Sequence, residues 1–445
     1  MAGSVFDSQV YGGLFSSGEA SRLFSDSAEV RAMLLVEGAL AKAQGEAGVI
    51  PQESAAAIGR AVVEIAVDPG VLKQPAVQNG VPVPGLVAAF REEMKAPEHA
   101  QFVHWGATSQ DIMDSALMLR LRQVLALVEA DVNTAVKALG KLAKAHAELP
   151  MPARTYGQHA TPTSFGAVAA GWGAPLLDLL EELPAMRQSC LVVSLSGAAG
   201  TSSALGAKAA EVRAAMAKGL ALQDPGRSWH TDRTPVLRIA DWLLRVTLAF
   251  GKIGEDSTAL AQTGIQEILL GGAGASSTMP QKQNPVAPSV LAALARQSSG
   301  LFAVLQGASM QQHQRDGAAW FTEWMCLPQI VLGAASAAKT GKELCTGLAP
   351  NPEAMSAALS GGLGMIHAEA LSFALAEKMP RPDAQAAVKA LCQEAQSGKT
   401  PLPELVKRDY PDLDTEALFD PAQQMGRAPW DALQFARQAE ELGNG

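Results

Sequence analysis

The sequence has few cysteines and no dense cluster of positive charge. Its four cysteines lack the Cys-x-x-Cys spacing of metal and redox sites, and they are Cys190, Cys326, Cys345 and Cys392. This scatter argues against a disulfide framework and against a zinc site. The formal net charge is −9 and no run rich in Lys and Arg occurs, so nucleic acid is not an expected partner.

Long apolar runs are missing as well. No apolar run reaches the length of about 18 residues that suggests a transmembrane helix. Residues 1–8 lack the basic region and the apolar core of a signal peptide. The sequence therefore predicts no membrane partner and a cytoplasmic location.

The size and composition are those of a globular protein with a large core. The chain has 445 residues, of which 48% are hydrophobic and 18% are charged. Because single cores stop growing at about 300 residues, we expect several domains.

The apolar residues recur with the period of a helix. They do so every three or four residues from Leu117 to Leu142, and Pro150 lies just beyond this pattern. Further long helices are predicted from Pro235 to about Leu270, with Gly251 and Gly254 interrupting it, and from Val286 to about Gln312. No two-residue alternation predicts a strand. The pattern indicates an all-α fold built on a central bundle of long helices.

Turn residues mark the candidate boundaries. Gly-Val-Pro-Val-Pro-Gly at 80–85 breaks the N-terminal region, and Gly-Leu-Ala-Pro-Asn-Pro at 347–352 resembles a linker. We therefore predict three helical domains, at 1–107, 108–347 and 348–445.

The most informative segment is Gly-Ala-Gly-Ala-Ser-Ser-Thr-Met-Pro-Gln-Lys-Gln-Asn-Pro at 272–285. Glycines permit unusual backbone angles, and the two prolines bound the segment. Ser276, Lys282 and Asn284 offer a proton-transfer group, a cation and an amide donor to a small anion. Composition alone favours an ordinary Gly/Ser-rich surface loop over a functional one.

Two distant segments carry further polar clusters. Residues 104–111 read His-Trp-Gly-Ala-Thr-Ser-Gln-Asp, and residues 154–163 read Arg-Thr-Tyr-Gly-Gln-His-Ala-Thr-Pro-Thr. In the first, Ser109 or Asp111 also fits the N-cap of the helix that follows. A capped helix N-terminus is itself a natural anion site, so both interpretations hold together.

The three segments resemble the shared regions of the fumarase/aspartase superfamily. The segment at 272–285 matches its pattern Gly-Ser-x-x-Met-x-x-Lys-x-Asn except that Ala275 replaces the glycine. The similarity extends from about residue 5 to about residue 440. It implies a homotetramer whose central helices form a shared core, with active sites assembled from several subunits and with no metal or organic cofactor.

Tyr156 distinguishes the branches of this superfamily. Members that expel an amine carry a histidine at this position, and it helps to protonate the leaving nitrogen. Tyrosine has an ordinary pKa of about 10, against about 6.5 for histidine, so it is a poor acid at neutral pH. The chain therefore resembles a cycloisomerase branch that acts on carboxy-substituted muconates, in which a carboxylate of the substrate adds to its own double bond.

The resemblance also assigns roles. Ser276 is the expected proton donor, and Lys282 and Asn284 are expected to stabilise the aci-carboxylate that forms. The expected binding residues for a small tricarboxylate are His104, Thr108, Ser109, Tyr156, Gln158, His159, Thr161, Arg233, Ser277, Met279 and Arg315.

Three alternatives stay open. Gln281 and Gln283 stand where the branch carries His and Arg, which leaves a sulfo-substituted muconate as a second substrate. A lyase releasing ammonia, an amine or water is disfavoured by Tyr156. A non-catalytic structural protein is disfavoured by the intact Ser276, Lys282 and Asn284.

Overall fold

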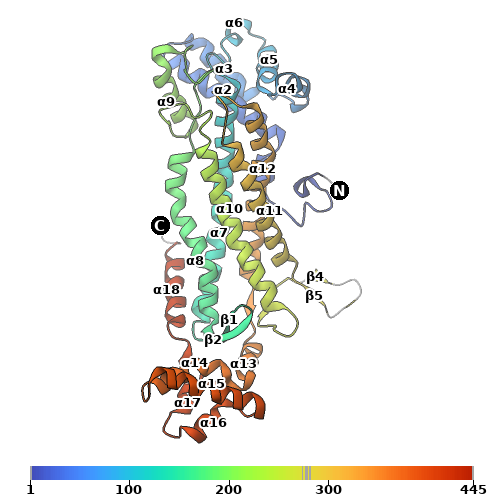
Figure 1. Ribbon diagram of the computed structural model, residues 1–445. Coiled ribbons are helices and arrows are strands. Elements are labelled where there is room, and N and C mark those ends of the chain that lie inside the picture. The colour runs from blue at the N-terminus through green and yellow to red at the C-terminus, as the bar shows by residue number, and fades with distance from the viewer. Residues whose placement is uncertain (1–2, 273, 276–278, 280–281, 443–445) are drawn as a thin grey trace. The chain divides into compact units, whose positions relative to one another are not determined.

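The computed structural model describes residues 3–272, 274, 275, 279 and 282–442. In this part the chain is helical apart from three small two-stranded sheets (Figure 1). The all-α fold predicted from the sequence is confirmed. The long helices are α7 (Ser109–Ala145), α8 (Phe165–Cys190), α10 (Thr234–Ala261), α11 (Val286–Ala308) and α12 (Gly317–Gly347).

The chain divides into two compact units. Unit 1 comprises Met1–Asp131, Leu179–Leu248 and Ala293–Lys339, and unit 2 comprises Val132–Asp178, Ala249–Ala292 and Thr340–Gly445. Each of the five long helices contributes residues to both units. The division into three domains stays a prediction.

Unit 1 also contains the shorter helices of the N-terminal half. They are α1 (Ala20–Leu23), α2 (Asp26–Glu46), α3 (Gln52–Glu64), α4 (Lys73–Asn79), α5 (Val83–Met94), α6 (Pro97–Ala100) and α9 (Ala209–Leu220). Helix α2 begins where Ser25 Oγ accepts the backbone N–H of Ala28, and Asp26 in its first turn complements the helix dipole.

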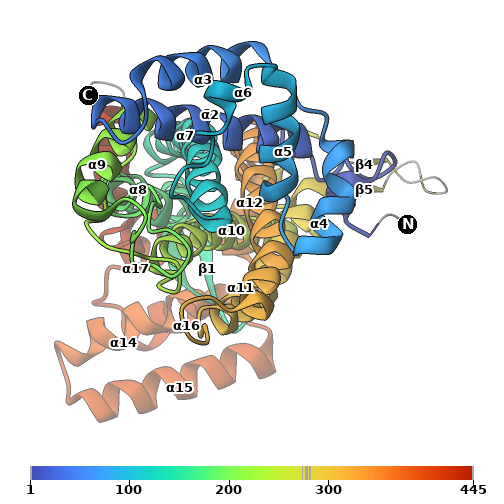
Figure 2. The ribbon, with the colours of Figure 1, turned by 90° about the horizontal axis from the view of Figure 1, so that it is seen from above.

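Helices α2 and α3 pack side by side in unit 1 (Figure 2). Their approach depends on small residues. A Cβ at Gly45 would lie 2.5 Å from Ala55 Cβ, and one at Gly38 would lie 3.2 Å from the Val62 side chain. Larger residues at these two positions would push the helices apart.

Unit 2 contains the remaining helices, α13 (Pro352–Ser360), α14 (Ala368–Ala376), α15 (Arg381–Gly398), α16 (Leu402–Asp409), α17 (Thr415–Leu418) and α18 (Ala428–Glu441). Helices α14, α15 and α16 are labelled in Figure 1. They bury a common apolar cluster that includes Leu371, Leu391 and Leu405. Among the described residues no single helix is both long and apolar enough to cross a membrane. Length and composition alone would admit the sharply bent pair Pro352–Ser360 and Gly362–Ala376.

The helix predicted from Pro235 to about Leu270 is shorter than expected. It ends at Ala261, and Ile268–Leu269 forms strand β3, paired with β6 (Ala349–Pro350). The predicted interruption by glycine is also wrong. Gly254 lies inside the helix, where a Cβ would lie 2.5 Å from the carbonyl oxygen of Pro288, so glycine is needed there for the close approach of α11.

The sequence pattern missed a β-hairpin. Strand β1 (Pro150–Thr155) pairs antiparallel with β2 (Gln158–Ser164). The pairing shifts between Pro152 and Arg154, which breaks the two-residue alternation that would have revealed the strand. The two-residue loop between the strands has positive φ at both positions, a geometry that suits the twist of a hairpin.

Candidate active site

The Asp111 carboxylate organises the predicted site residues of unit 1. It lies in the first turn of α7, and its side chain is fully buried. Its Oδ2 accepts the backbone N–H of Thr108 at 3.0 Å, while the backbone N–H of Asp111 donates to the Thr108 carbonyl. The helix start is therefore closed by a reciprocal pair of hydrogen bonds, with Thr108 and Ser109 half-buried beside it.

The same carboxylate binds a second segment of unit 1. It accepts four further hydrogen bonds, from Ser196 N at 2.8 Å, Gly197 N at 2.9 Å, Ser194 Oγ at 3.1 Å and His230 Nε2 at 2.8 Å. A carboxylate with this many donors is held in one orientation.

His230 connects this network to Arg315. Its Nε2 donates to Asp111, and its buried Nδ1 has no hydrogen-bond partner among the described residues. Gln110 Nε2 donates to the His230 carbonyl at 2.8 Å, and Gln110 Oε1 accepts from Arg315 Nε at 2.9 Å. The amide thereby positions the exposed guanidinium of Arg315, which remains available to an anion.

His104 is held by a buried glutamate. Its backbone is in the left-handed region, with φ of 63°, and its Nδ1 lies 2.7 Å from Glu37 Oε1 on α2. Burial by itself lowers the pKa of His104. The hydrogen bond to Glu37 and the charges of Glu37 and Asp111 outweigh burial and the opposing charge of Arg91, so the pKa is raised above 6.5.

Arg233 occupies a different environment from the one expected of a substrate ligand. It is 2% exposed, and its guanidinium donates to both carboxylate oxygens of Asp114 and to both of Glu323 at 2.7 to 2.9 Å. It also stacks 4.8 Å from the Trp229 ring centroid. Because its guanidinium bridges Asp114 and Glu323, Arg233 links α7 to α12 inside unit 1.

The hairpin in unit 2 carries four of the predicted binding residues. Tyr156 lies at its tip with φ of 52° and is fully exposed, and Gln158 and His159 are exposed beside it. Thr161 is half-buried further along β2. Among the described residues of this unit, none encloses the phenol ring.

A buried ion pair anchors this hairpin. Both nitrogens at the end of Arg154 donate to the Glu267 carboxylate at 2.7 Å, and Glu267 is completely buried. Arg154 Nη2 also lies 3.3 Å from His159 Nε2. This geometry fixes the strand that leads to Tyr156 and orients the imidazole of His159.

The segment at 272–285 is only partly described. Ser276, the predicted proton donor, lies outside the described residues, as does Ser277. Strand β4 (Gly274–Ala275) pairs with β5 (Gln283–Asn284), so the two ends of the segment lie side by side. Lys282 and Met279 are exposed, and Asn284 is half-buried.

The predicted residues thus form one group in each unit. His104, Thr108, Ser109 and Arg315 lie around Asp111 in unit 1. The hairpin residues and the segment at 272–285 belong to unit 2. Within the described ranges no cluster of three or more His, Cys, Asp or Glu side chains has metal-binding geometry.

Sequence reasoning missed Glu37, Gln110 and Glu267, each of which positions a predicted binding residue. Glu37 and Glu267 are almost completely buried acids. A charged residue on the apolar face of the α2 pattern was a usable signal, because such residues are seldom buried without a partner. Nothing in the local sequence marks Gln110 or Glu267.

Comparison with known proteins identifies the family. Residues 16–300 match the lyase family. The chain is 35% identical to 3-carboxy-cis,cis-muconate cycloisomerase of Pseudomonas aeruginosa over 94% of each protein. It is also 35% identical to nitrosuccinate lyase of Streptomyces davaonensis, covering 91% of this chain and 89% of that protein.

A solved structure agrees. The 3-carboxy-cis,cis-muconate lactonizing enzyme of Pseudomonas putida superposes with a TM-score of 0.90 at 33% identity, covering 98% of this chain and all of that one. The chain therefore belongs to the lyase family within the fumarase/aspartase superfamily.

The Glu37–His104 pair makes stability depend on pH. A folded-state pKa above 6.5 stabilises the fold fully below about pH 6.5, and the contribution is lost as pH rises through the raised value. We predict that Glu37→Gln lowers the free energy of unfolding by about 1 to 3 kcal/mol at pH 6 and by less at pH 9.

Urea denaturation at both pH values measures the difference. Glu46→Gln, at an exposed glutamate of the same helix, is the control and should show no such pH dependence. An equal loss at pH 6 and pH 9 in Glu37→Gln would contradict titration of His104.

Proposed function

We propose that this protein is a cycloisomerase that converts 3-carboxy-cis,cis-muconate to 4-carboxymuconolactone. The proposal rests above all on Tyr156, which replaces the acid catalyst of amine-releasing relatives in a chain similar to cycloisomerases along nearly its full length. Ring closure within one substrate has no separate leaving group that needs a proton.

The reaction needs one new C–O bond and one proton transfer. The distal carboxylate of the substrate attacks the carbon that bears the 3-carboxyl group. A proton is added to the neighbouring carbon, and negative charge develops on the carboxylate attached to that carbon. The nucleophile is already ionised, so no base has to activate it.

Three residues of the segment at 272–285 fit this chemistry. Ser276 supplies the proton in the proposal, and Lys282 and Asn284 stabilise the developing charge. Because Lys282 is exposed in a single chain, it gains electrostatic strength only when other surfaces exclude water from around it.

The substrate is a trianion, so the site needs local positive charge. In unit 1, Arg315 presents a guanidinium oriented by Gln110, and the hydrogen bond to Glu37 raises the pKa of His104, which favours its cationic form. The N-terminus of α7, at Ser109, adds a backbone N–H donor. These groups bind the carboxylates that do not react.

We further propose that the protein is a homotetramer whose active sites combine segments from different subunits. The exposure of Tyr156 and Lys282 supports this, because both residues need an enclosing surface to perform their roles. The grouping of the predicted residues into two separate units agrees with it.

A second candidate is elimination of a weakly basic group from a succinate adduct. It is favoured by the 35% identity to nitrosuccinate lyase. The Tyr156 argument disfavours only leaving groups that need a proton, and a weakly basic anion departs without one. A sulfo-substituted muconate remains the alternative substrate because of Gln281 and Gln283.

The first test is activity on defined substrates. Loss of the muconate absorbance should accompany lactone formation, with kcat/KM higher for the 3-carboxy than for the 3-sulfo compound. Ser276→Ala should lower kcat by about a hundred- to ten-thousand-fold with little change in KM, and Ser277→Ala should cost much less. Turnover of nitrosuccinate without muconate turnover would refute the proposal.

The second test concerns Tyr156. Without a proton-transfer role, Tyr156→Phe should lose at most one neutral hydrogen bond of about 0.5 to 1.5 kcal/mol, which is a two- to thirteen-fold effect on kcat/KM. Tyr156→Ala should be worse because it removes the ring. A loss of three or more orders of magnitude in Tyr156→Phe would make the phenol an acid or a base.

The third test concerns the shared site. Thr108→Ala and Ser276→Ala should each be inactive, and mixing them under conditions of subunit exchange should restore part of the activity. Each variant treated alone in the same way is the control. A fully active monomer in sedimentation, or no recovery despite proven exchange, would contradict a composite site.

A further inference from the structure

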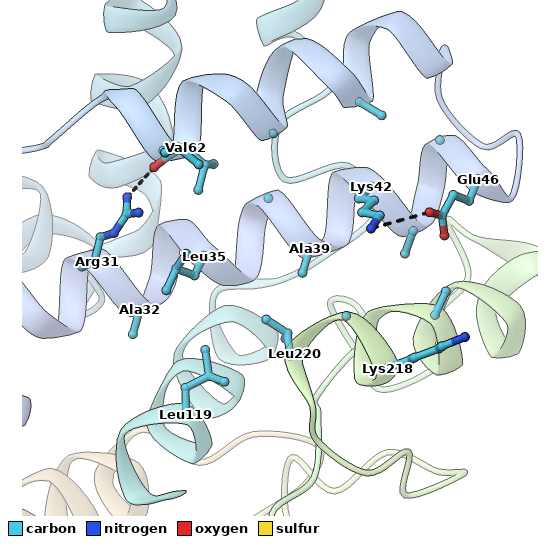
Figure 3. A pocket seen from close by; sticks show the side chains of 18 of the residues that line it. Arg31, Ala32, Leu35, Ala39, Lys42, Glu46, Val62, Leu119, Lys218 and Leu220 are labelled. Carbon is cyan, nitrogen blue, oxygen red and sulfur yellow. Dashed lines mark hydrogen bonds and ion pairs between the residues drawn. The ribbon is translucent and has the colours of Figure 1, made fainter. Parts of the chain in front are cut away.

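Unit 1 contains a cavity that none of the predicted active-site residues lines. It has a volume of about 1250 Å³ and lies between α2, α3, α7 and α9. Figure 3 shows Leu35 and Ala39 of α2 on one side of it, with Leu119 of α7 and Leu220 of α9 on the other. Its volume is ample for a ligand the size of a drug molecule or an acyl chain.

Much of the cavity wall consists of residues that are both small and apolar. Alanines and glycines of α2 and α3 make up much of the lining, among them Ala32, Gly38, Ala39 and Ala55. Small side chains leave the volume unfilled, and apolar walls favour an apolar occupant over water.

The charged residues around the cavity are mostly cations. Five basic side chains line it, Arg31, Lys42, Arg120, Arg122 and Lys218, against the single carboxylate of Glu46. The protein has a net charge of −9, so the excess of positive charge around this cavity is a local feature opposite in sign to the protein as a whole.

Two of these cations are held in place by uncharged partners. Arg31 donates to the carbonyl of Val62, and Arg122 donates to the carbonyls of Leu220 and Ala221 at 2.7 and 2.8 Å. Carbonyl oxygens orient a guanidinium without cancelling its charge. The positive potential at the cavity therefore persists.

Arg120 is the most deeply buried of the five cations. It is 7% exposed, its closest carboxylate is Glu29 at 3.4 Å, and its Nε has no hydrogen-bond partner within the described part of the chain. Its guanidinium lies 5.1 Å from the Phe24 ring centroid. Burial lowers the pKa of Arg120 despite the charge of Glu29. A buried cation with an open donor is costly unless an anion completes it.

We propose that this cavity binds an amphipathic carboxylate, with the carboxylate at Arg120 and the apolar body along Leu35, Ala39 and Leu119. The apolar walls select the body, and the five cations select the negative head. The site is separate from the proposed catalytic residues.

Titration calorimetry with decanoate, below its micelle concentration, tests the proposal on the full chain. We expect saturable binding of one decanoate per chain, and much weaker binding of butyrate and of decyltrimethylammonium. Arg120→Gln should weaken decanoate binding at least about tenfold, since one charge-assisted contact is lost. The control is Arg60→Gln, which removes an exposed arginine of α3 that does not line the cavity.

Ala39→Leu provides an independent variant, because its longer side chain occupies the part of the cavity where the apolar body is proposed to lie. It should abolish decanoate binding while circular dichroism and catalytic activity stay unchanged. Equal binding of decyltrimethylammonium, or unchanged binding in Arg120→Gln, would overturn the proposal. The proposal would also be overturned if the wild-type protein bound no decanoate and the Ala39→Leu variant sedimented differently from it. The cavity would then face another copy of the chain.

Discussion

The candidate site of unit 1 depends on one buried carboxylate. Asp111 accepts five hydrogen bonds that come from the start of α7, from residues 194–197 and from His230. A buried charge is tolerated only when its acceptor sites are satisfied, so these segments are fixed relative to one another by the same requirement. The neighbouring Gln110 donates to the His230 carbonyl and accepts from Arg315, so it fixes the position of the Arg315 guanidinium. The groups proposed to bind substrate are therefore positioned by a residue that has no free acceptor to offer a ligand.

A second buried network reinforces the first. Asp114 follows Asp111 by three residues on α7 and pairs with Arg233, which also binds Glu323 of α12. Residues three apart in a helix share a face, so the two networks hold the same face of α7. In the low dielectric of the interior, removing one partner would leave an uncompensated charge. The guanidinium of Arg233, which the family resemblance suggested as a binding group, is engaged in this network.

Unit 2 presents its chemistry differently. The Arg154–Glu267 pair anchors the hairpin, while Tyr156 and Lys282 are exposed. The electrostatic interactions of an exposed charge such as Lys282 are weak in water and strong where water is excluded. This agrees with the proposal that another subunit completes the site. Family membership and the tyrosine at position 156 together favour chemistry that needs no acid for a leaving group.

The sequence alone determined the helical class and the approximate positions of α7 and α11, and it marked the three polar segments. Helical period, turn residues and side-chain chemistry are local properties, and the turn residues at 347–352 likewise mark the end of α12 and the start of α13. The tertiary structure decided the rest. Gln110 and Glu267 became visible only through partners 205 and 113 residues away, and local sequence does not encode such pairings. The end of α10 at Ala261 and the hairpin at 150–164 were set by strand pairing that overrides local pattern. The roles of Arg233 and Gly254 were likewise fixed by what packs against them, because burial and close approach are properties of the folded chain.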